Sequence, residues 1–320
     1  MRTLKLKDLG EARALQRIKE LVGLPSLDDV YLRGSEVFKL DGFNLSFSFP
    51  FMDYFDIGWK AVSAAMSDVI ARGAVPHLVM SSIGLNVNEP EENLIGLVKG
   101  VKMASEYYSS AYVGGDTNSS HNSGWIDIAV IGEALCVKSW RDIRPGDVAL
   151  ITDRLGYTSE VFLSYERGWS IPLTRESIIR VKHPVVKRQL IHLFKEMCSS
   201  ISSSTDVSDG VLISLHKVLS EIGYGIDLKE IPVREDILSK LESFGYTVDD
   251  ILKYSGEEYE AIIFVKNNDL DRVINFMRRK GLDPIVLGVV REGEGISLEG
   301  RRLRVAGWDN FAGFTEVVFK

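Results

Sequence analysis

The stretch SSSTDVSDGVLISLHKVLSEIG, residues 202–223, places two carboxylates directly in front of an apolar periodic run. The apolar residues fall at helical spacing and predict a helix with one buried face: Val211, Leu212, Leu215, Val218, Leu219 and Ile222. Asp206 or Ser208 could cap this helix, because a short side-chain oxygen accepts a hydrogen bond from a free backbone N–H. A cap leaves the second carboxylate, Asp209, unexplained, since two close carboxylates repel unless positive charge lies between them. The helix N-terminus supplies some of that charge, and a divalent cation supplies more.

The overall composition is that of an ordinary globular chain. It has 320 residues, 45% of them hydrophobic and 26% charged, which predicts two domains of usual size. The net charge of −7 and the lack of a long basic run argue against nucleic acid as a partner. No apolar run is long enough to cross a membrane. Cys136 and Cys198 lie far apart, so we expect no disulfide framework and a cytoplasmic location.

Hydrophobic periodicity divides the chain into two mixed α/β parts. Residues 1–140 predict one domain, with helices at 11–22, 56–72 and 91–107 and strands at 36–50, 78–85, 111–113 and 125–137. We expect turns in this part at Asp41–Gly42 and at Gly114–Gly115. The turn-rich segment 141–147 marks the boundary. Residues 141–320 predict a second domain, with strands at 147–153 and 259–265, helices around 158–167, 175–180, 184–200, 211–222 and 270–281, and short strands after them.

Six aspartates share one setting, within two residues of Gly, Ser or another Asp and near a predicted strand end or helix terminus: Asp28, Asp41, Asp68, Asp116, Asp206 and Asp209. Asp68 differs because it lies in a helix of mostly small and apolar residues, where a partly buried carboxylate needs a partner. Arg72, four residues later, is the local candidate. Carboxylates that converge with Gly-rich turns suit Mg²⁺ bound to nucleotide phosphates. The chain contains neither the GxxxxGK[ST] phosphate loop nor the protein-kinase motif set.

Taken in order, these motifs resemble the thiamine-monophosphate kinase family, within the superfamily of aminoimidazole-ribotide synthetase-like proteins. SD at 67–68, GGDTN at 114–118 and DVSDG at 206–210 resemble superfamily motifs. GEEYE at 256–260 and GWDNF at 307–311 resemble motifs of the thiamine-phosphate branch. The resemblance covers nearly the whole chain. It implies a two-domain fold of mixed sheets with packed helices, a homodimer built through the N-terminal domain, and Mg²⁺-dependent, in-line transfer of phosphate from ATP to thiamine monophosphate.

The resemblance also implies roles for single residues. The six aspartates would hold several Mg²⁺ ions, and the protein would otherwise position the reactants without a catalytic side chain. The residues implied near the nucleotide are Gly114, Gly115, Thr117, Ser208 and Arg141, which would replace an arginine expected near Trp140. Ser48, Glu257 and Trp308 would face the substrate, since an aromatic plane and a carboxylate suit a cationic heterocycle. Without the resemblance, Trp308 is interpreted as a core aromatic and Glu257 as a solvated charge.

Several positions depart from the family pattern. Lys39 and Leu40 precede Asp41 where a small hydroxyl residue is usual, Ser48 stands in the place of a histidine, and Ser119 in the place of an arginine. The residues expected to bind metal are thus nearly all present, while some of those expected to bind the substrate are replaced. Two alternatives stay open: an ATP-using enzyme of the same superfamily with another substrate, or a nucleotide-binding protein without turnover.

Overall fold

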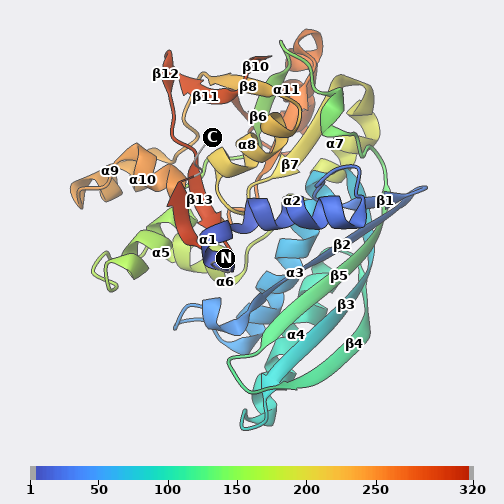
Figure 1. The fold of residues 1–320 in the computed structure, drawn as a ribbon, viewed down its shortest axis with the longest axis vertical. Coiled ribbons are helices and arrows are strands. Elements are labelled where there is room, and N and C mark those ends of the chain that lie inside the picture. Colours follow the sequence, from blue (N-terminus) through green and yellow to red (C-terminus); the bar gives the residue numbers. More distant parts are fainter. Residues whose placement is uncertain (1–4, 317–320) are drawn as a thin grey trace, which may run out of the picture.

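The computed structural model describes residues 5–316, which form two α/β halves that share an interface (Figure 1). The helices of the N-terminal half are α1 (Leu6–Leu9), α2 (Glu11–Val22), α3 (Tyr54–Ala71) and α4 (Glu91–Tyr107), and its strands are β1 (Tyr31–Arg33), β2 (Glu36–Asn44), β3 (Ala74–Asn86), β4 (Ala111–Ser120) and β5 (Trp125–Ala134). The helices of the C-terminal half are α5 (Tyr157–Glu166), α6 (Arg175–Lys182), α7 (Leu190–Met197), α8 (Val211–Glu221), α9 (Glu235–Ser243), α10 (Val248–Lys253) and α11 (Leu270–Arg279). Its strands are β6 (Val148–Ile151), β7 (Ile201–Asp206), β8 (Tyr224–Leu228), β9 (Ala261–Val265), β10 (Ile285–Glu292), β11 (Gly295–Leu298), β12 (Arg301–Arg302), β13 (Ala306–Asp309) and β14 (Gly313–Glu316).

The N-terminal sheet has the strand order β1-β2-β5-β3-β4, in which β3 and β4 run parallel and the other neighbours antiparallel. Helices α3 and α4 cover one face of it (Figure 1). The small residues of α3 are explained by its close packing against α4. A Cβ on Gly58 would lie 2.1 Å from the carbonyl oxygen of Leu97, and one on Gly100 would lie 2.1 Å from that of Phe55. This packing buries nearly all of α3, including Asp68.

The C-terminal sheet has seven strands in the order β12-β11-β8-β10-β6-β9-β7, with β7 at one edge. Residues 202–223 fold as most of β7, a turn at Gly210, and α8. Gly210 occupies the N-cap position of α8, so the predicted cap by Asp206 or Ser208 is wrong. Strand β7 was not predicted, because its serine-rich sequence is polar although all six residues are buried. Within the protein, its hydroxyls form hydrogen bonds in place of those to water. For example, Thr205 Oγ1 donates to Asp29 at 2.7 Å.

Both turns predicted in the N-terminal sheet are wrong, since β2 and β4 continue through them. The glycines instead allow close approach between strands. A Cβ on Gly42 would lie 2.2 Å from a carboxylate oxygen of Asp127, and one on Gly115 would lie 1.7 Å from the carbonyl oxygen of Ser81. The predicted helix at 184–200 is also shorter, because α7 begins only at Leu190.

A disulfide joins Cys136, which follows β5, to Cys198, which follows α7. The expectation that the chain has no disulfide framework is corrected by this bond. They are 62 residues apart in sequence, but the fold brings their Cα atoms to 5.5 Å, which is the usual separation for a disulfide. The bond links the two halves beside a buried core that both of them build, since Met66 and Ile70 of α3 belong to the same cluster as Phe194 of α7.

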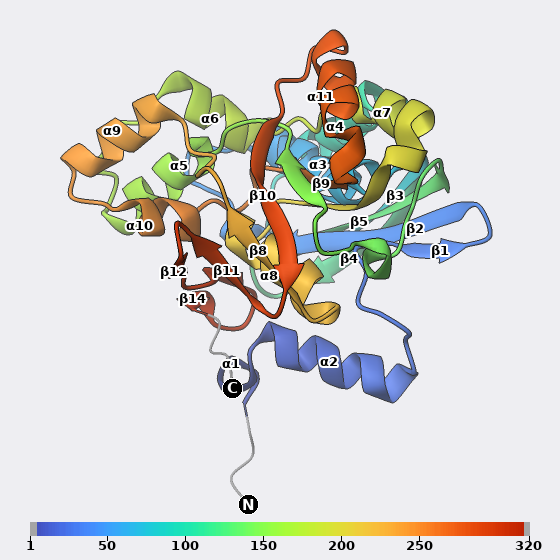
Figure 2. The same ribbon diagram turned by 90° about the horizontal axis from the view of Figure 1, so that it is seen from above.

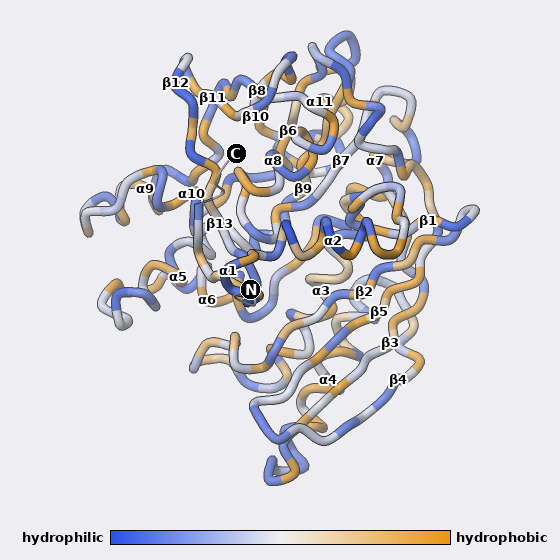
Figure 3. The backbone as a smooth tube through the Cα atoms, in the orientation of Figure 1, coloured by the Kyte–Doolittle hydropathy of each residue, from blue (hydrophilic) through white to orange (hydrophobic). Residues whose placement is uncertain are grey.

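Helix α2 lies at the edge of the molecule (Figure 2), and all of its residues are at least partly exposed. Polar and apolar residues alternate along it (Figure 3). Its ends are held by polar contacts. Lys19 bonds to Glu221 of α8 at 2.8 Å, and the Glu11 backbone N–H donates to Asp309 at 2.7 Å. Among residues 5–316, no helix combines the length and the apolar character needed to span a bilayer.

Candidate metal and nucleotide site

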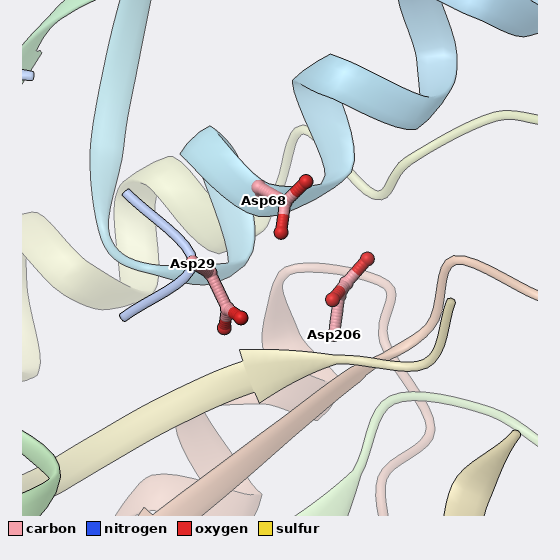
Figure 4. A group of neighbouring side chains, drawn as sticks. All are labelled: Asp29, Asp68 and Asp206. Atoms are coloured by element: carbon pink, nitrogen blue, oxygen red, sulfur yellow. The ribbon is translucent and has the colours of Figure 1, made fainter. Parts of the chain in front are cut away.

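Three buried carboxylates converge where the two halves meet (Figure 4). Asp29 lies in the loop before β1, Asp68 in the last turns of α3, and Asp206 at the end of β7. One carboxylate oxygen from each lies within 4.8 Å of the others. The small-residue packing of α3 and the edge position of β7 therefore bring together side chains that are distant in sequence.

Two lysines and two hydroxyls supply the polar partners that these carboxylates need. Lys39 Nζ lies 2.7 Å from Asp68 Oδ2, and Lys217 Nζ lies 2.6 Å from Asp29 Oδ1. Ser67 Oγ donates to Asp206 Oδ2 at 2.5 Å, and Thr205 Oγ1 donates to Asp29 Oδ2 at 2.7 Å. Asp68 therefore pairs with a lysine from β2, and the predicted local pairing with Arg72 is wrong.

The environment shifts the pKa values of these carboxylates in opposite directions. Burial opposes ionisation of Asp29, but Lys217 and Arg72 outweigh it and lower its pKa to about 2. Burial and the neighbouring Asp29 raise the pKa of Asp206 to about 6. Burial and the charge of Glu11 raise the pKa of Asp209 to about 7. Burial also raises the pKa of Asp68, although Lys39 acts against this shift. A bound cation would favour the ionised forms of Asp68, Asp206 and Asp209 and so oppose these upward pKa shifts.

The raised pKa values predict how Mg²⁺ stabilisation depends on pH. Folding takes up protons at Asp206 and Asp209, so their stabilising contribution is full below about pH 4 and is lost as pH rises through about 6 to 7. Mg²⁺ binds the ionised form and compensates for that loss. We expect the rise in Tm caused by Mg²⁺ to be larger at about pH 8 than at about pH 5. Thermal unfolding with Mg²⁺ or with EDTA across this range measures it, and an equal rise at both pH values would contradict it.

The donor set fits Mg²⁺. This ion prefers oxygen ligands and usually binds through one or two carboxylates, with water and phosphate completing its shell. Asp29, Asp68 and Asp206 supply carboxylate oxygens at one point, and the elevated pKa values of Asp68 and Asp206 indicate a deficit of positive charge there. A divalent cation would remove that deficit.

The structure places the other predicted aspartates at different distances from this cluster. Asp28 lies outside it, where both of its oxygens accept hydrogen bonds from Arg72. Asp41 borders the cluster, 3.6 Å from Lys39 Nζ. Asp209 lies three residues after the end of β7, near enough for the charges of Asp206 and Asp41 to add to the effect of burial in raising its pKa, and its backbone oxygen accepts from Trp308 N at 2.9 Å. Asp116 is exposed on β4 and pairs in register with Ser82, so it lies on the sheet face opposite α3 and is not brought to the cluster.

The predicted nucleotide residues fall into separate places. Gly114, Gly115 and Thr117 lie on β4, at the edge of the N-terminal sheet. Ser208 is half-buried, and its backbone oxygen accepts from Glu257 N at 2.6 Å. Arg141 is exposed in the short turn Trp140–Asp142. Trp140 is the residue of that turn that faces the cluster, because its ring packs against both Arg72 and Lys217.

Ser48 lies in the loop between β2 and α3, Trp308 packs against that loop, and Glu257 contacts α3. Trp308 packs edge-to-face against Phe47, with ring centroids 5.6 Å apart, and Ser48 is the next residue in the chain. Glu257 Oε2 accepts from Lys60 Nζ at 2.7 Å, and Glu257 adopts a positive φ of 58°. A non-glycine residue in this conformation is strained, and such strain is typical of functional sites. Neither the core interpretation of Trp308 nor the solvated interpretation of Glu257 fits these contacts.

Sequence reasoning missed several residues of the site: Asp29, Lys39, Lys60, Ser67 and Lys217. For Lys39 a signal existed, because alternate residues of a strand share a face, and Lys39 therefore points to the same side as Asp41. For Asp29 the sequence offers a pair of adjacent aspartates without indicating which one turns inward. The buried Lys60 gives no such signal, since its partner Glu257 is 197 residues away.

Two mixed α/β halves that meet at buried carboxylates define a class of two-domain proteins, and comparisons with known proteins identify it. The family model of the AIR synthase related protein N-terminal domain matches residues 28–134, and that of the C-terminal domain matches residues 144–301. Thiamine-monophosphate kinase from Pyrobaculum calidifontis is 31% identical over 245 residues, which cover 75% of this chain and 78% of that protein. The chain therefore belongs to the AIR synthase related family and, within it, to the thiamine-monophosphate kinases.

Two further comparisons, one of sequence and one of structure, cover almost the full length of the chain. Thiamine-monophosphate kinase from Aquifex aeolicus is 26% identical over 324 residues, which cover 96% of this chain and 100% of the relative. A solved structure of AaThiL complexed with AMPPCP and TMP is similar with a TM-score of 0.82 and 24% identity, and the match covers 97% of this chain and 100% of that one. These similarities confirm the predicted fold class of two mixed-sheet domains.

Proposed function

We propose that the protein uses ATP to phosphorylate thiamine monophosphate to thiamine diphosphate. In the transfer step, a phosphate oxygen of thiamine monophosphate forms a bond to the γ-phosphorus of ATP. The bond from the γ-phosphorus to the oxygen of the β-phosphate breaks, and ADP leaves. The convergence of Asp29, Asp68 and Asp206 in a member of this kinase family carries the proposal. The carboxylates would hold Mg²⁺, which when bound neutralises charge on the transferring group.

The protein's own residues would bind and orient the reactants. Asp41 and Asp209 border the cluster and would extend it toward the phosphates. Lys60 fixes the strained Glu257, and the ring of Trp308, held by Phe47, offers a plane for a cationic heterocycle. Such positioning is sufficient in principle, because much of a phosphoryl-transfer barrier is lowered by orientation and electrostatics.

The decisive experiment measures ADP release by the purified protein with Mg²⁺ and ATP, with and without thiamine monophosphate, and identifies the product by mass. Thiamine diphosphate in amounts equal to ADP supports the proposal. ADP release only with another acceptor would favour a different substrate within the superfamily. ATP binding without any ADP release would favour a protein without turnover, and Ser48 and Ser119 would then be the first positions to restore.

We also propose a homodimer built through the N-terminal sheet. Its face opposite α3 carries large apolar side chains that are exposed to solvent: Leu40, Leu78, Met80 and Val113. An apolar sheet face of this kind is typical of a surface that a second copy covers. ATP as co-substrate supports a cytoplasmic location as a further proposal.

A paired substitution tests the dimer. Leu40→Glu combined with Val113→Glu places two charges on the apolar face, and we expect the dimer to dissociate into monomers because a buried unpaired charge is costly. Light scattering after size-exclusion chromatography measures the mass. Leu21→Glu on α2, where Leu21 is 87% exposed, is the matched control and is expected to leave the dimer intact. A wild-type chain that is monomeric throughout would refute the proposed dimer.

A further inference from the structure

Lys39 lies among carboxylates rather than beside a single one. Its Nζ is 2.7 Å from Asp68 Oδ2 and 3.6 Å from Asp41 Oδ2, and its side chain is only 18% exposed. The geometry follows from the strand, since Lys39 and Asp41 are two residues apart on β2 and share the face toward α3. An ammonium group thus bridges carboxylates from two different elements.

A bridging contact of this kind resembles a metal position more than an ordinary ion pair. A surface pair joins one cation to one anion and is usually exposed. Here one cation faces oxygens of two residues in a largely buried place, and Mg²⁺ is typically held by one or two carboxylates. Lys217 differs from Lys39, because its Nζ bonds to Asp29 and lies over the ring of Trp140.

We infer that the Lys39 ammonium takes the place of one divalent cation between Asp41 and Asp68, so that this chain binds one metal ion fewer than its carboxylates could hold. The inference rests on the metal site of the proposed function. A divalent ion and an ammonium cannot share this position, because like charges at such short range repel strongly. The cluster of Asp29, Asp68 and Asp206 still offers other carboxylate oxygens to a metal ion.

The test counts bound Mn²⁺, which takes oxygen ligands as Mg²⁺ does. The purified full chain is titrated with Mn²⁺ in the presence of a non-hydrolysable ATP analogue, and free Mn²⁺ is read from its electron paramagnetic resonance signal. We expect Lys39→Thr to bind one more Mn²⁺ per chain than the wild type. Equal counts for the two proteins, or no bound Mn²⁺ in either, would overturn the inference.

Two control variants separate the position of the charge from its amount. Lys39→Arg keeps a cation at the site, and we expect it to bind as many Mn²⁺ ions as the wild type. Lys102→Thr removes the same charge from the exposed surface of α4, where Lys102 pairs with Glu106, and we expect an unchanged count. An extra ion in Lys102→Thr would show that net charge alone sets the count, which would overturn the inference.

A second measurement decides the matter if Lys39→Thr does not fold. Anomalous scattering from wild-type crystals soaked in Mn²⁺ locates the ions directly. The inference requires Lys39 to remain bound to Asp68, with no Mn²⁺ bridging Asp41 and Asp68, and an ion in that bridge overturns it. Neither measurement needs turnover. A wild-type protein that forms no thiamine diphosphate would refute the proposed function, and the number of bound Mn²⁺ ions would still test the inference about Lys39.

Discussion

Asp68→Asn is expected to lower the rate of thiamine diphosphate formation at least about a hundredfold. Metal ions contribute several kcal/mol of charge stabilisation to the transition state in reactions of this kind. A loss of about 1.4 kcal/mol lowers the rate tenfold. Asp68 is central to the cluster, since it lies near both Asp29 and Asp206 and holds Lys39. An amide has nearly the same shape as a carboxylate but removes the charge that attracts the cation. Steady-state ADP release at saturating ATP and varied Mg²⁺ measures the loss.

The control for this variant is Asp249→Asn, which makes the same chemical change at an exposed residue that pairs with Arg301 at 3.5 Å. We expect its rate to match that of the wild type. A rate for Asp68→Asn within a few fold of the control would contradict a metal role for the cluster. Saturation at higher Mg²⁺ with full recovery of the rate would mean that Asp68 contributes affinity for the metal and little to the transfer step.

Much of the fold was predictable because its signals are local. The periodicity of α2, α4 and α8 and the alternation along β2 and β5 depend on neighbouring residues alone. Asp68 was singled out by the same kind of local argument, since a charge among small and apolar residues must be buried with a partner. Its buried position confirms that argument, while the partner proved to be Lys39, 29 positions earlier on another element.

What could not be predicted depends on contacts between distant segments. Strand β7 has the composition of a loop, and only the partners of its hydroxyls, such as Asp29 for Thr205, make its burial favourable. The choice between Asp28 and Asp29 depends in the same way on the Arg72 side chain, which binds Asp28 and leaves Asp29 to the cluster. The disulfide depends on how the two halves pack, which no spacing between Cys136 and Cys198 reveals.

Arg72 joins the elements that carry the site. Its side chain is fully buried and donates to Asp28, to the hydroxyl of Ser203, and to the backbone oxygens of Ser204 and Lys138. These contacts connect the end of α3 to β7, to the loop before β1 and to the segment after β5. When the guanidinium is removed, the oxygens that accept its hydrogen bonds cannot all turn to solvent. We therefore expect its removal to lower the free energy of unfolding.

Arg72→Met is therefore expected to lower the free energy of unfolding by about 3–5 kcal/mol, the usual cost of removing one partner of a buried ion pair. Denaturant unfolding in EDTA measures it, because bound metal would otherwise add its own stabilisation. The matched control is Arg278→Met on α11, where the side chain is 60% exposed and its Nε lies 3.7 Å from Asp283 Oδ1. The change in its free energy of unfolding is expected to stay within about 0.5 kcal/mol. Equal stability of the two variants would mean that water or rearranged side chains satisfy Asp28 and the carbonyls. The alignment of Asp68 with Asp206 would then depend on the packing of α3 alone.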